Sequence, residues 1–372
     1  MHKTYRYRLF TNASQERELG STLESHRRLY NAALDGRQLC WETAGVGWNY
    51  YDQSRWFTAQ RKLNPYFANL NASSAQQTLM NLDKAYKAFF DRCKRGEKPG
   101  HPRFKSRDRF ESFAYAMTGH GGGCKIINGK LRLQNIGTIR VRWHRPVPDD
   151  AVIKQATIKR YAGKWYVCFA VELPDVTPVA VPPASVGIDL GITSFVTTSY
   201  GESLGDSKIL RRHLSELRRR QRALSRCQRG SSRRCKVKSR VTRLHAAVAN
   251  ARRDMHHKVA HQLVTRYGFI AAENLNVLGM LKNRRLSRSI ADAGWGQFVS
   301  ILTHKAEGAG VQVELVDPRN TSQKCSQCGQ MVRKSLAVRV HRCLCGCVLD
   351  RDVNAARNVL ARTGAKSSQC EC

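Results

Sequence analysis

Three acidic residues lie at positions where the presence of a carboxylate has to be explained by a specific chemical role. Asp189 lies inside the apolar run 185–192, where a buried carboxylate is costly unless it is paired or bound to a metal. Glu273 ends a second apolar run. Asp352 lies in the first turn of an expected helix that Asp350 can cap, so capping accounts for only one of these two acids. The three lie far apart in sequence, and only the fold could gather them.

Three gathered carboxylates repel one another unless cations lie between them. Carboxylate oxygens are ligands that Mg²⁺ and Mn²⁺ prefer. Two such ions about 4 Å apart can activate a water molecule and stabilise the leaving oxygen of a phosphodiester. We therefore predict that Asp189, Glu273 and Asp352 are catalytic ligands of two Mg²⁺ or Mn²⁺ ions.

A cluster of cysteines precedes the last acid. Cys325 and Cys328 have the two-residue spacing of a zinc knuckle. The second half of the cluster is irregular, because Cys343, Cys345 and Cys347 alternate with other residues. We predict one structural Zn²⁺ held by the first pair and by two of these three thiols, so that Cys347 could replace Cys343 or Cys345.

The charge balance indicates a polyanionic partner. Lys and Arg number 64 against 28 Asp and Glu, which leaves a net charge of +36, and a compact protein this positive is expected to bind nucleic acid. A membrane surface is the alternative, but no apolar run approaches the roughly 20 residues of a span. The N-terminus has no secretory pattern. We expect a cytoplasmic, nucleoid-associated protein without membrane contact.

Periodicity predicts a mixed α/β chain of several domains. A strand near Tyr5 is followed by a helix that Asn12 and Gln15 can cap, and a second helix follows Ser73 and Ser74. From residue 124 to 173 the hydrophobic period is two, which predicts an antiparallel β-domain with the helices inserted after its first strand.

The remaining segments predict turns, a linker and a pair of basic helices. Asn128-Gly129 and Ala162-Gly163 indicate hairpin turns, and Thr177–Pro183 reads as a linker. Residues 206–266 hold 19 Lys and Arg against three acids. We predict that they form two helices broken near Gly230, and that this one-signed charge contacts phosphates.

In their order along the chain, these motifs resemble TnpB, the accessory protein of insertion sequences that is related to type V CRISPR effectors. The matching strings are Gly187-Ile-Asp-Leu-Gly, Glu273-Asn-Leu, Cys325-Ser-Gln-Cys-Gly and Asp350-Arg-Asp-Val-Asn-Ala-Ala. The resemblance covers nearly the whole chain. It implies an RNA-guided DNA endonuclease that binds a guide RNA from the transposon end, recognises a short transposon-adjacent motif and cuts double-stranded target DNA.

The resemblance also implies a fold and a ligand set. An RNase H-like (RuvC) nuclease domain would carry Asp189, Glu273 and Asp352, with a zinc ribbon inserted before the last acid. Aligning on Cys345 puts Arg342 where the family has its third zinc ligand, so Cys343 is expected to substitute for it. The implied domains are a β-barrel wedge domain (1–12 and 100–178), a helical recognition domain (13–99), the nuclease domain (183–320 and 350–366), the ribbon (321–349) and a tail (367–372).

Three other functions are alternatives to RNA-guided DNA cleavage. A nuclease-inactive, RNA-guided repressor would lack one of the acids, and all three are present. An actin-like ATPase shares the string around Asp189, but the chain lacks further glycine-rich phosphate loops. A DDE-type transposase would not be expected to carry a ribbon between its second and third acids.

Overall fold

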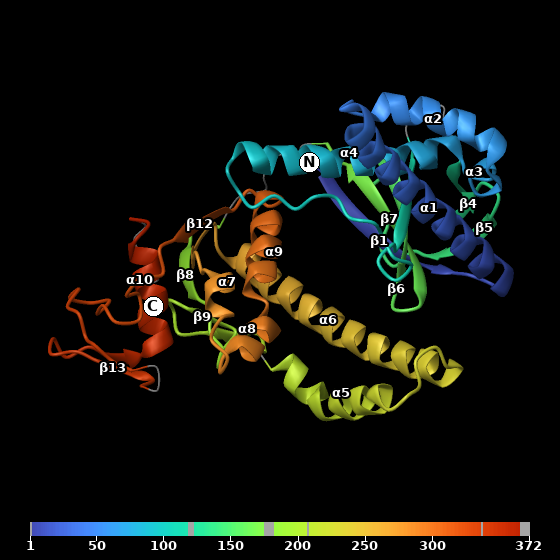
Figure 1. Ribbon diagram of the computed structural model, residues 1–372. Helices are drawn as coiled ribbons and strands as arrows, with labels where there is room; N and C mark the ends of the chain where they lie inside the picture. Colours follow the sequence, from blue (N-terminus) through green and yellow to red (C-terminus); the bar gives the residue numbers. More distant parts are fainter. Residues whose placement is uncertain (1, 118–122, 175–181, 207, 336–337, 365–372) are drawn as a thin grey trace. The chain divides into compact units, whose positions relative to one another are not determined.

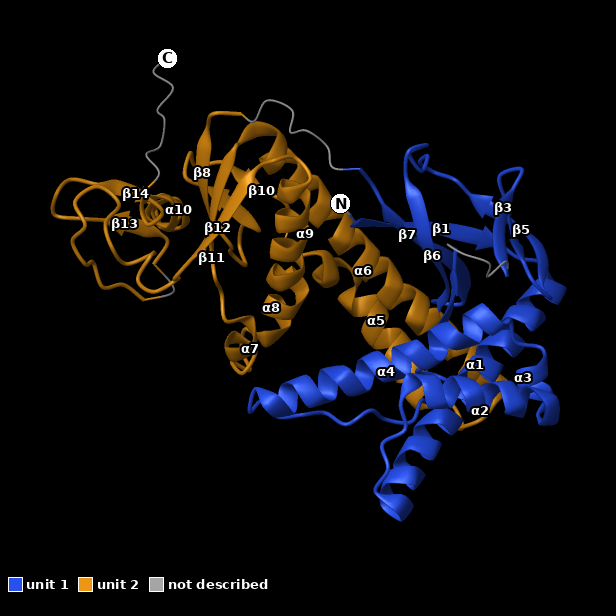
Figure 2. Ribbon diagram, turned by 90° about the horizontal axis from the view of Figure 1, so that it is seen from above, with its two compact units in different colours: residues 1–175 blue, residues 176–372 orange. Residues whose placement is uncertain are grey.

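The chain divides into two compact units, residues 1–175 and 176–372 (Figure 2). The computed structural model describes residues 2–117, 123–174, 182–206, 208–335 and 338–364. Each unit has a hydrophobic core of its own and is described by itself. Most of the expected linker, 177–183, and all of the expected tail, 367–372, lie outside the described residues.

Unit 1 contains a seven-stranded antiparallel sheet with helices inserted after its first strand (Figure 1). The strand order is β2-β6-β7-β1-β5-β4-β3. The first strand therefore lies between strands that follow the helices in sequence, which confirms the predicted insertion of the helices after the first strand. The strands are β1 (His2–Phe10), β2 (Ser112–Ala116), β3 (Cys124–Ile127), β4 (Lys130–Leu133), β5 (Gly137–Arg142), β6 (Val152–Tyr161) and β7 (Lys164–Glu172).

Both predicted hairpin turns of this sheet are confirmed. Asn128 and Gly129, between β3 and β4, have φ of 48° and 68°. Ala162 and Gly163, between β6 and β7, have φ of 50° and 75°. Two successive positive φ values match the right-handed twist of the flanking strands.

Four described helices complete unit 1: α1 (Ala13–Ala44), α2 (Tyr50–Leu63), α3 (Pro65–Ala68) and α4 (Ala72–Lys94). The predicted capping pair of α1 is confirmed, because the Asn12 side chain accepts from the Gln15 backbone N–H at 2.8 Å. Helix α4 begins slightly earlier than predicted, with Asn71 as its cap. The sequence pattern did not predict α2 or α3.

Unit 2 is built on a five-stranded mixed sheet of order β10-β9-β8-β11-β12, with a separate two-stranded sheet. Strand β8 pairs antiparallel with β9 and parallel with β11. The strands are β8 (Ser185–Asp189), β9 (Val196–Thr198), β10 (Ser203–Leu204), β11 (Phe269–Glu273), β12 (Gln312–Val316), β13 (Val340–Arg342) and β14 (Val348–Asp350). The described helices are α5 (Ile209–Ser225), α6 (Ser232–Arg266), α7 (Val277–Met280), α8 (Ser287–Ala293), α9 (Trp295–Glu307) and α10 (Arg351–Ala361).

Helices cover both faces of this sheet. Ile270 of β11 packs in a core with α6, α8 and α9. Ala271, the next residue, packs with Leu360 of α10 on the opposite face. Helices α5 and α6 are the predicted basic pair, joined near Gly230, and they pack side by side (Figure 1). Within the described parts of the chain, no helix is long and apolar enough to cross a membrane.

Candidate metal centres and basic surface

Two neighbouring parallel strands place Asp189 and Glu273 together. Each acid is the last residue of its strand, β8 or β11. Ile188 is paired with Ala272, so the acids follow one residue later on strands about 4.8 Å apart. Side chains alternate between the faces of a strand, and Glu273 therefore shares the face of Ala271, which packs against α10.

Helix α10 brings the third acid to the same edge. Asp350 caps this helix by accepting from the Asp352 backbone N–H at 2.8 Å, which confirms the predicted helix start. The helix lies close against β8 at Gly187, where an added Cβ would be 2.1 Å from the Ala356 carbonyl oxygen. Only glycine permits this approach. A Cβ on Gly191, beyond the end of β8, would lie 3.9 Å from an Asp352 carboxylate oxygen.

Burial and mutual repulsion raise the pKa of each acid. Burial raises the pKa of Asp189 well above its ordinary value, and the Glu273 and Asp352 carboxylates raise it further. Burial also raises the pKa of Glu273. For Asp352, burial and then the Asp350 carboxylate raise the pKa, while Arg339, 3.8 Å away, opposes them. Positive charge among the acids would relieve this repulsion.

The carboxylates are spread more widely than the ligands of a single ion. Among the described residues, the two sets with all donor atoms within 4.8 Å of one another are built from cysteine and histidine. The oxygen donors of these acids are of the kind that Mg²⁺ and Mn²⁺ prefer, and a cation among them would relieve the repulsion that raises the pKa of Asp189.

The first of the two cysteine sets consists of Cys325, Cys328, Cys343 and Cys345. The Sγ atoms of Cys325 and Cys345 are 3.7 Å apart, and those of Cys328 and Cys343 are 3.5 Å apart. A tetrahedron with Zn–S bonds of 2.3 Å has edges of about 3.8 Å. The spacing therefore fits one Zn²⁺.

Hydrogen bonds favour the thiolate of Cys325, whereas at Cys345 the Cys347 backbone N–H lowers the pKa but hydrogen bonds with the neighbouring thiols outweigh it and raise the pKa to about 12. Burial acts to raise the pKa of Cys325, but hydrogen bonds from the backbone N–H groups of Cys328 and Gln327 and from the His341 side chain outweigh it and lower the pKa to about 5. Zinc binds the thiolate form. The second set, Cys325, His341 and Cys347, is wholly buried and shares Cys325 with the first. Sequence analysis did not assign His341, whose only signal was its place before the cysteine run.

Buried asparagines of α10 connect the two centres. Asn354 donates to the Lys324 carbonyl at 2.8 Å, and Asn358 donates to the Thr321 carbonyl at 2.7 Å. Thr321 in turn donates its hydroxyl to Glu273 Oε1 at 2.6 Å. These side chains were not predicted as functional, although two asparagines four residues apart on the inner face of a helix are a recognisable signal.

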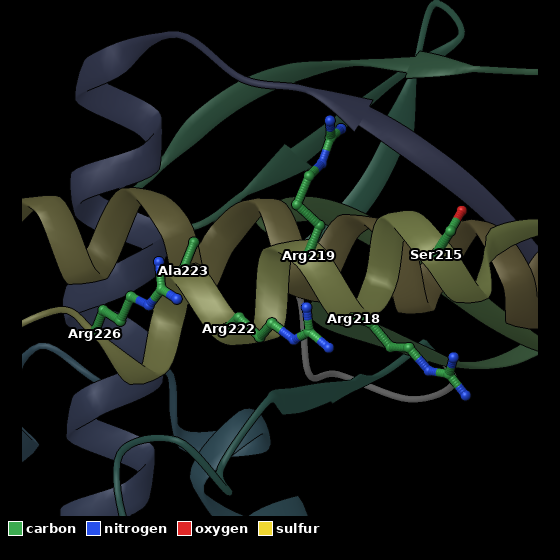
Figure 3. Close-up of a pocket in the computed structure, with 6 residues that line it drawn as sticks. All are labelled: Ser215, Arg218, Arg219, Arg222, Ala223 and Arg226. Carbon is green, nitrogen blue, oxygen red and sulfur yellow. The ribbon is translucent and has the colours of Figure 1, made fainter.

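The basic helix α5 exposes arginines along its length (Figure 3). Arg218, Arg219, Arg222 and Arg226 line an open cavity of about 520 Å³, and no ion pair is recorded for them within the described segments. By contrast, Arg220 pairs with Glu216. Unneutralised guanidinium groups on a helix are suited to phosphate contact.

Three family models match parts of this chain. A model of the IS605 OrfB family, described as "Probable transposase", matches residues 168–284. A "Cas12f1-like, TNB domain" model matches 295–359, and a "Helix-turn-helix domain" model of the OrfB family matches 1–45.

Two relatives extend over nearly the whole chain. A Streptomyces pristinaespiralis protein named "Putative RNA-guided DNA endonuclease" is 36% identical, over 99% of this chain and 90% of its own length. The Escherichia coli K12 protein of the same description, InsQ, is 30% identical over 96% and 92%. A solved Cas12f1 chain, from a complex with sgRNA and target DNA, has a similar fold, with a TM-score of 0.63 at 15% identity over 96% of this chain and 98% of that one.

Proposed function

Because this chain belongs to the TnpB (IS605 OrfB) family, we propose that it is an RNA-guided DNA endonuclease. It binds a guide RNA from the transposon end, recognises a short transposon-adjacent motif and cleaves the DNA that pairs with the guide. The placement of Asp189 and Glu273 at the ends of β8 and β11, and of Asp352 in the first turn of α10 beside them, carries the cleavage step in this proposal.

The acids act as ligands of two divalent ions in an RNase H-like (RuvC) domain. The strand order β10-β9-β8-β11-β12, with Asp189 ending the central strand, supports this assignment. When bound, the ions supply an activated water and stabilise the leaving oxygen. The chain itself orients the ligands: Thr321 holds one oxygen of Glu273, and the cap formed by Asp350 fixes the first turn around Asp352.

The cysteine cluster acts as a structural zinc ribbon. Cys325, Cys328, Cys343 and Cys345 are the ligands that the sulfur spacing supports, with Cys347 left outside the set. Through Asn354 the ribbon is tied to α10 and hence to Asp352. Loss of zinc would therefore loosen the third acid as well as the ribbon.

The remaining domains follow the same proposal. The sheet of unit 1 would be the wedge domain, a barrel in the family, and the helices inserted after β1 would be the recognition domain. The unpaired arginines of α5 would contact nucleic acid phosphates. The site of action would be the nucleoid in the cytoplasm.

The test is Asp189→Ala in the full-length chain with its copurified guide RNA. We expect cleavage of matched DNA to be lost while RNA binding remains close to that of the wild type, because Asp189 lies at the metal centre. Cleavage by this variant at the wild-type rate would refute the assignment. A wild-type complex that binds matched DNA without cutting it would instead indicate an RNA-guided repressor.

A further inference from the structure

Unit 1 has a cavity of about 660 Å³ between helices α1 and α4. Figure 2 shows the course of these two helices. Its volume lies in the range of small-molecule and cofactor sites. The C-terminal parts of α1 and α4 line it, together with the segment before α2 and His101. It contains none of the acids or cysteines discussed above.

Aromatic rings form much of its wall. Trp41 is 66% exposed and Phe90 is 54% exposed, so both present ring surface to solvent. Deeper in the wall, the rings of Phe89 and Tyr86 lie with their centroids 5.1 Å and 5.4 Å from that of His101. Exposed aromatic surface gathered in one cavity indicates a binding site, whereas scattered apolar residues would not.

The floor of the cavity is polar and fully engaged. The buried Arg37 guanidinium donates to Asp83 Oδ1 at 3.0 Å and to Gln53 Oε1 at 2.9 Å. It also lies over the Tyr86 ring, 4.8 Å from the ring centroid. These contacts hold the floor in one arrangement without a ligand.

Trp48 is also held in place before any ligand binds. An added Cβ on Gly36 would be 2.3 Å from the Trp48 ring, so the indole packs directly on the backbone of α1. The Trp56 ring meets Trp48 edge-on at a centroid distance of 5.7 Å. A wall of preformed rings loses little freedom when a flat partner stacks on it.

The charge around the cavity distinguishes two candidate ligands, a second copy of this chain and nucleic acid. His101 belongs to the segment 92–109, which holds eight Lys and Arg against two acids. A second copy of this chain would bring another net charge of +36 against it. Nucleic acid supplies both complementary charge and flat rings, and base–aromatic stacking tolerates any base.

We propose that this cavity, which we call the aromatic pocket, takes one unpaired nucleobase of a bound RNA, with the adjoining phosphates facing the segment 92–109. RNA loops and ends offer unstacked bases, whereas a DNA duplex would first have to be opened. The identity of the strand as guide RNA rests on the proposed function. The stacking site itself rests on the rings and charges described here.

The experiment uses the full-length chain and the RNA that copurifies when it is expressed with the DNA flanking its gene. Ultraviolet crosslinking and mass spectrometry would locate the attached nucleotides. RNA affinity would then be measured for Trp41→Ala and Phe90→Ala. The matched control is Tyr51→Ala, because Tyr51 is 71% exposed on α2 but does not line the pocket. Trp41→Phe keeps a ring and tests for rescue.

We expect crosslinks to the Trp41 or Phe90 peptide and an affinity loss of about tenfold in each alanine variant. The control and Trp41→Phe should bind RNA nearly as the wild type does. Wild-type affinity in both alanine variants, together with no crosslink at the pocket, would overturn the proposal even if the protein still cut DNA under RNA guidance. A crosslink to target DNA alone, or a wild-type dimer that Trp41→Ala dissociates, would overturn it too. A wild-type chain that retains no discrete RNA would refute the proposed function instead.

Discussion

The close packing of α10 against β8 leads to a prediction about how the acids are positioned. In Gly187→Ala the new methyl group would lie 2.1 Å from the Ala356 carbonyl oxygen and 2.9 Å from the Leu360 backbone nitrogen. Both are backbone atoms, so the helix must withdraw by about 1 Å, at an overpacking cost of about 1–3 kcal/mol. Because α10 carries Asp352, the third acid moves with it.

A displacement of about 1 Å at a catalytic group can cost about 100-fold in rate. We therefore expect Gly187→Ala to cut matched DNA about 100-fold more slowly than the wild type, in single-turnover assays at saturating Mg²⁺. RNA affinity should change little, because the substitution lies inside unit 2 and away from its basic helices. Chemical unfolding would report the accompanying loss of stability.

The matched control is Gly296→Ala. Gly296 lies in α9, and an added Cβ there meets nothing within 4 Å. This substitution should leave cleavage unchanged and stabilise the helix slightly. Wild-type cleavage by Gly187→Ala would show that the contact between α10 and β8 does not set the position of Asp352, and would refute this reasoning.

Three further predictions concern the acids, the zinc ligands and the basic helix. Asp189→Asn should stabilise the metal-free chain at neutral pH, because burial and the neighbouring carboxylates raise the pKa of Asp189 in the folded state. The gain should vanish as the pH falls towards the ordinary carboxyl pKa, and urea unfolding in EDTA across this pH range would test it. Cys345→Ser should lower the zinc content found by elemental analysis and Cys347→Ser should not, so equal loss in both would contradict the ligand set. Arg218→Gln should reduce the slope of log K for nucleic acid binding against log salt concentration by about one, the value of one phosphate contact. Arg220→Gln should reduce this slope less, because Arg220 already pairs with Glu216. Equal slopes in both variants would argue against phosphate contact.

Much of this architecture could be predicted from the sequence because it depends on local chemistry. The Asn12 cap, the Asn128-Gly129 turn and the helix start at Asp350 each involve neighbouring residues. The acids were recognisable because a carboxylate at the end of an apolar strand is costly. Their assignment as metal ligands stays a prediction.

The features that sequence analysis missed depend on contacts between distant segments. Nothing near Gly187 in sequence indicates that α10 lies against it. The bond from Thr321 to Glu273 joins residues 48 positions apart. The aromatic pocket gathers the ends of α1 and α4 with His101, and its residues in the sequence looked like ordinary helix and loop composition.

The central claim is that Asp189, Glu273 and Asp352 hold two divalent ions. Anomalous scattering at the manganese edge, from crystals of the full-length complex grown with Mn²⁺, tests it most directly. The account predicts two peaks about 4 Å apart among these three carboxylates. An ordered site with no peak there, or ions bound elsewhere while DNA is still cut, would contradict it.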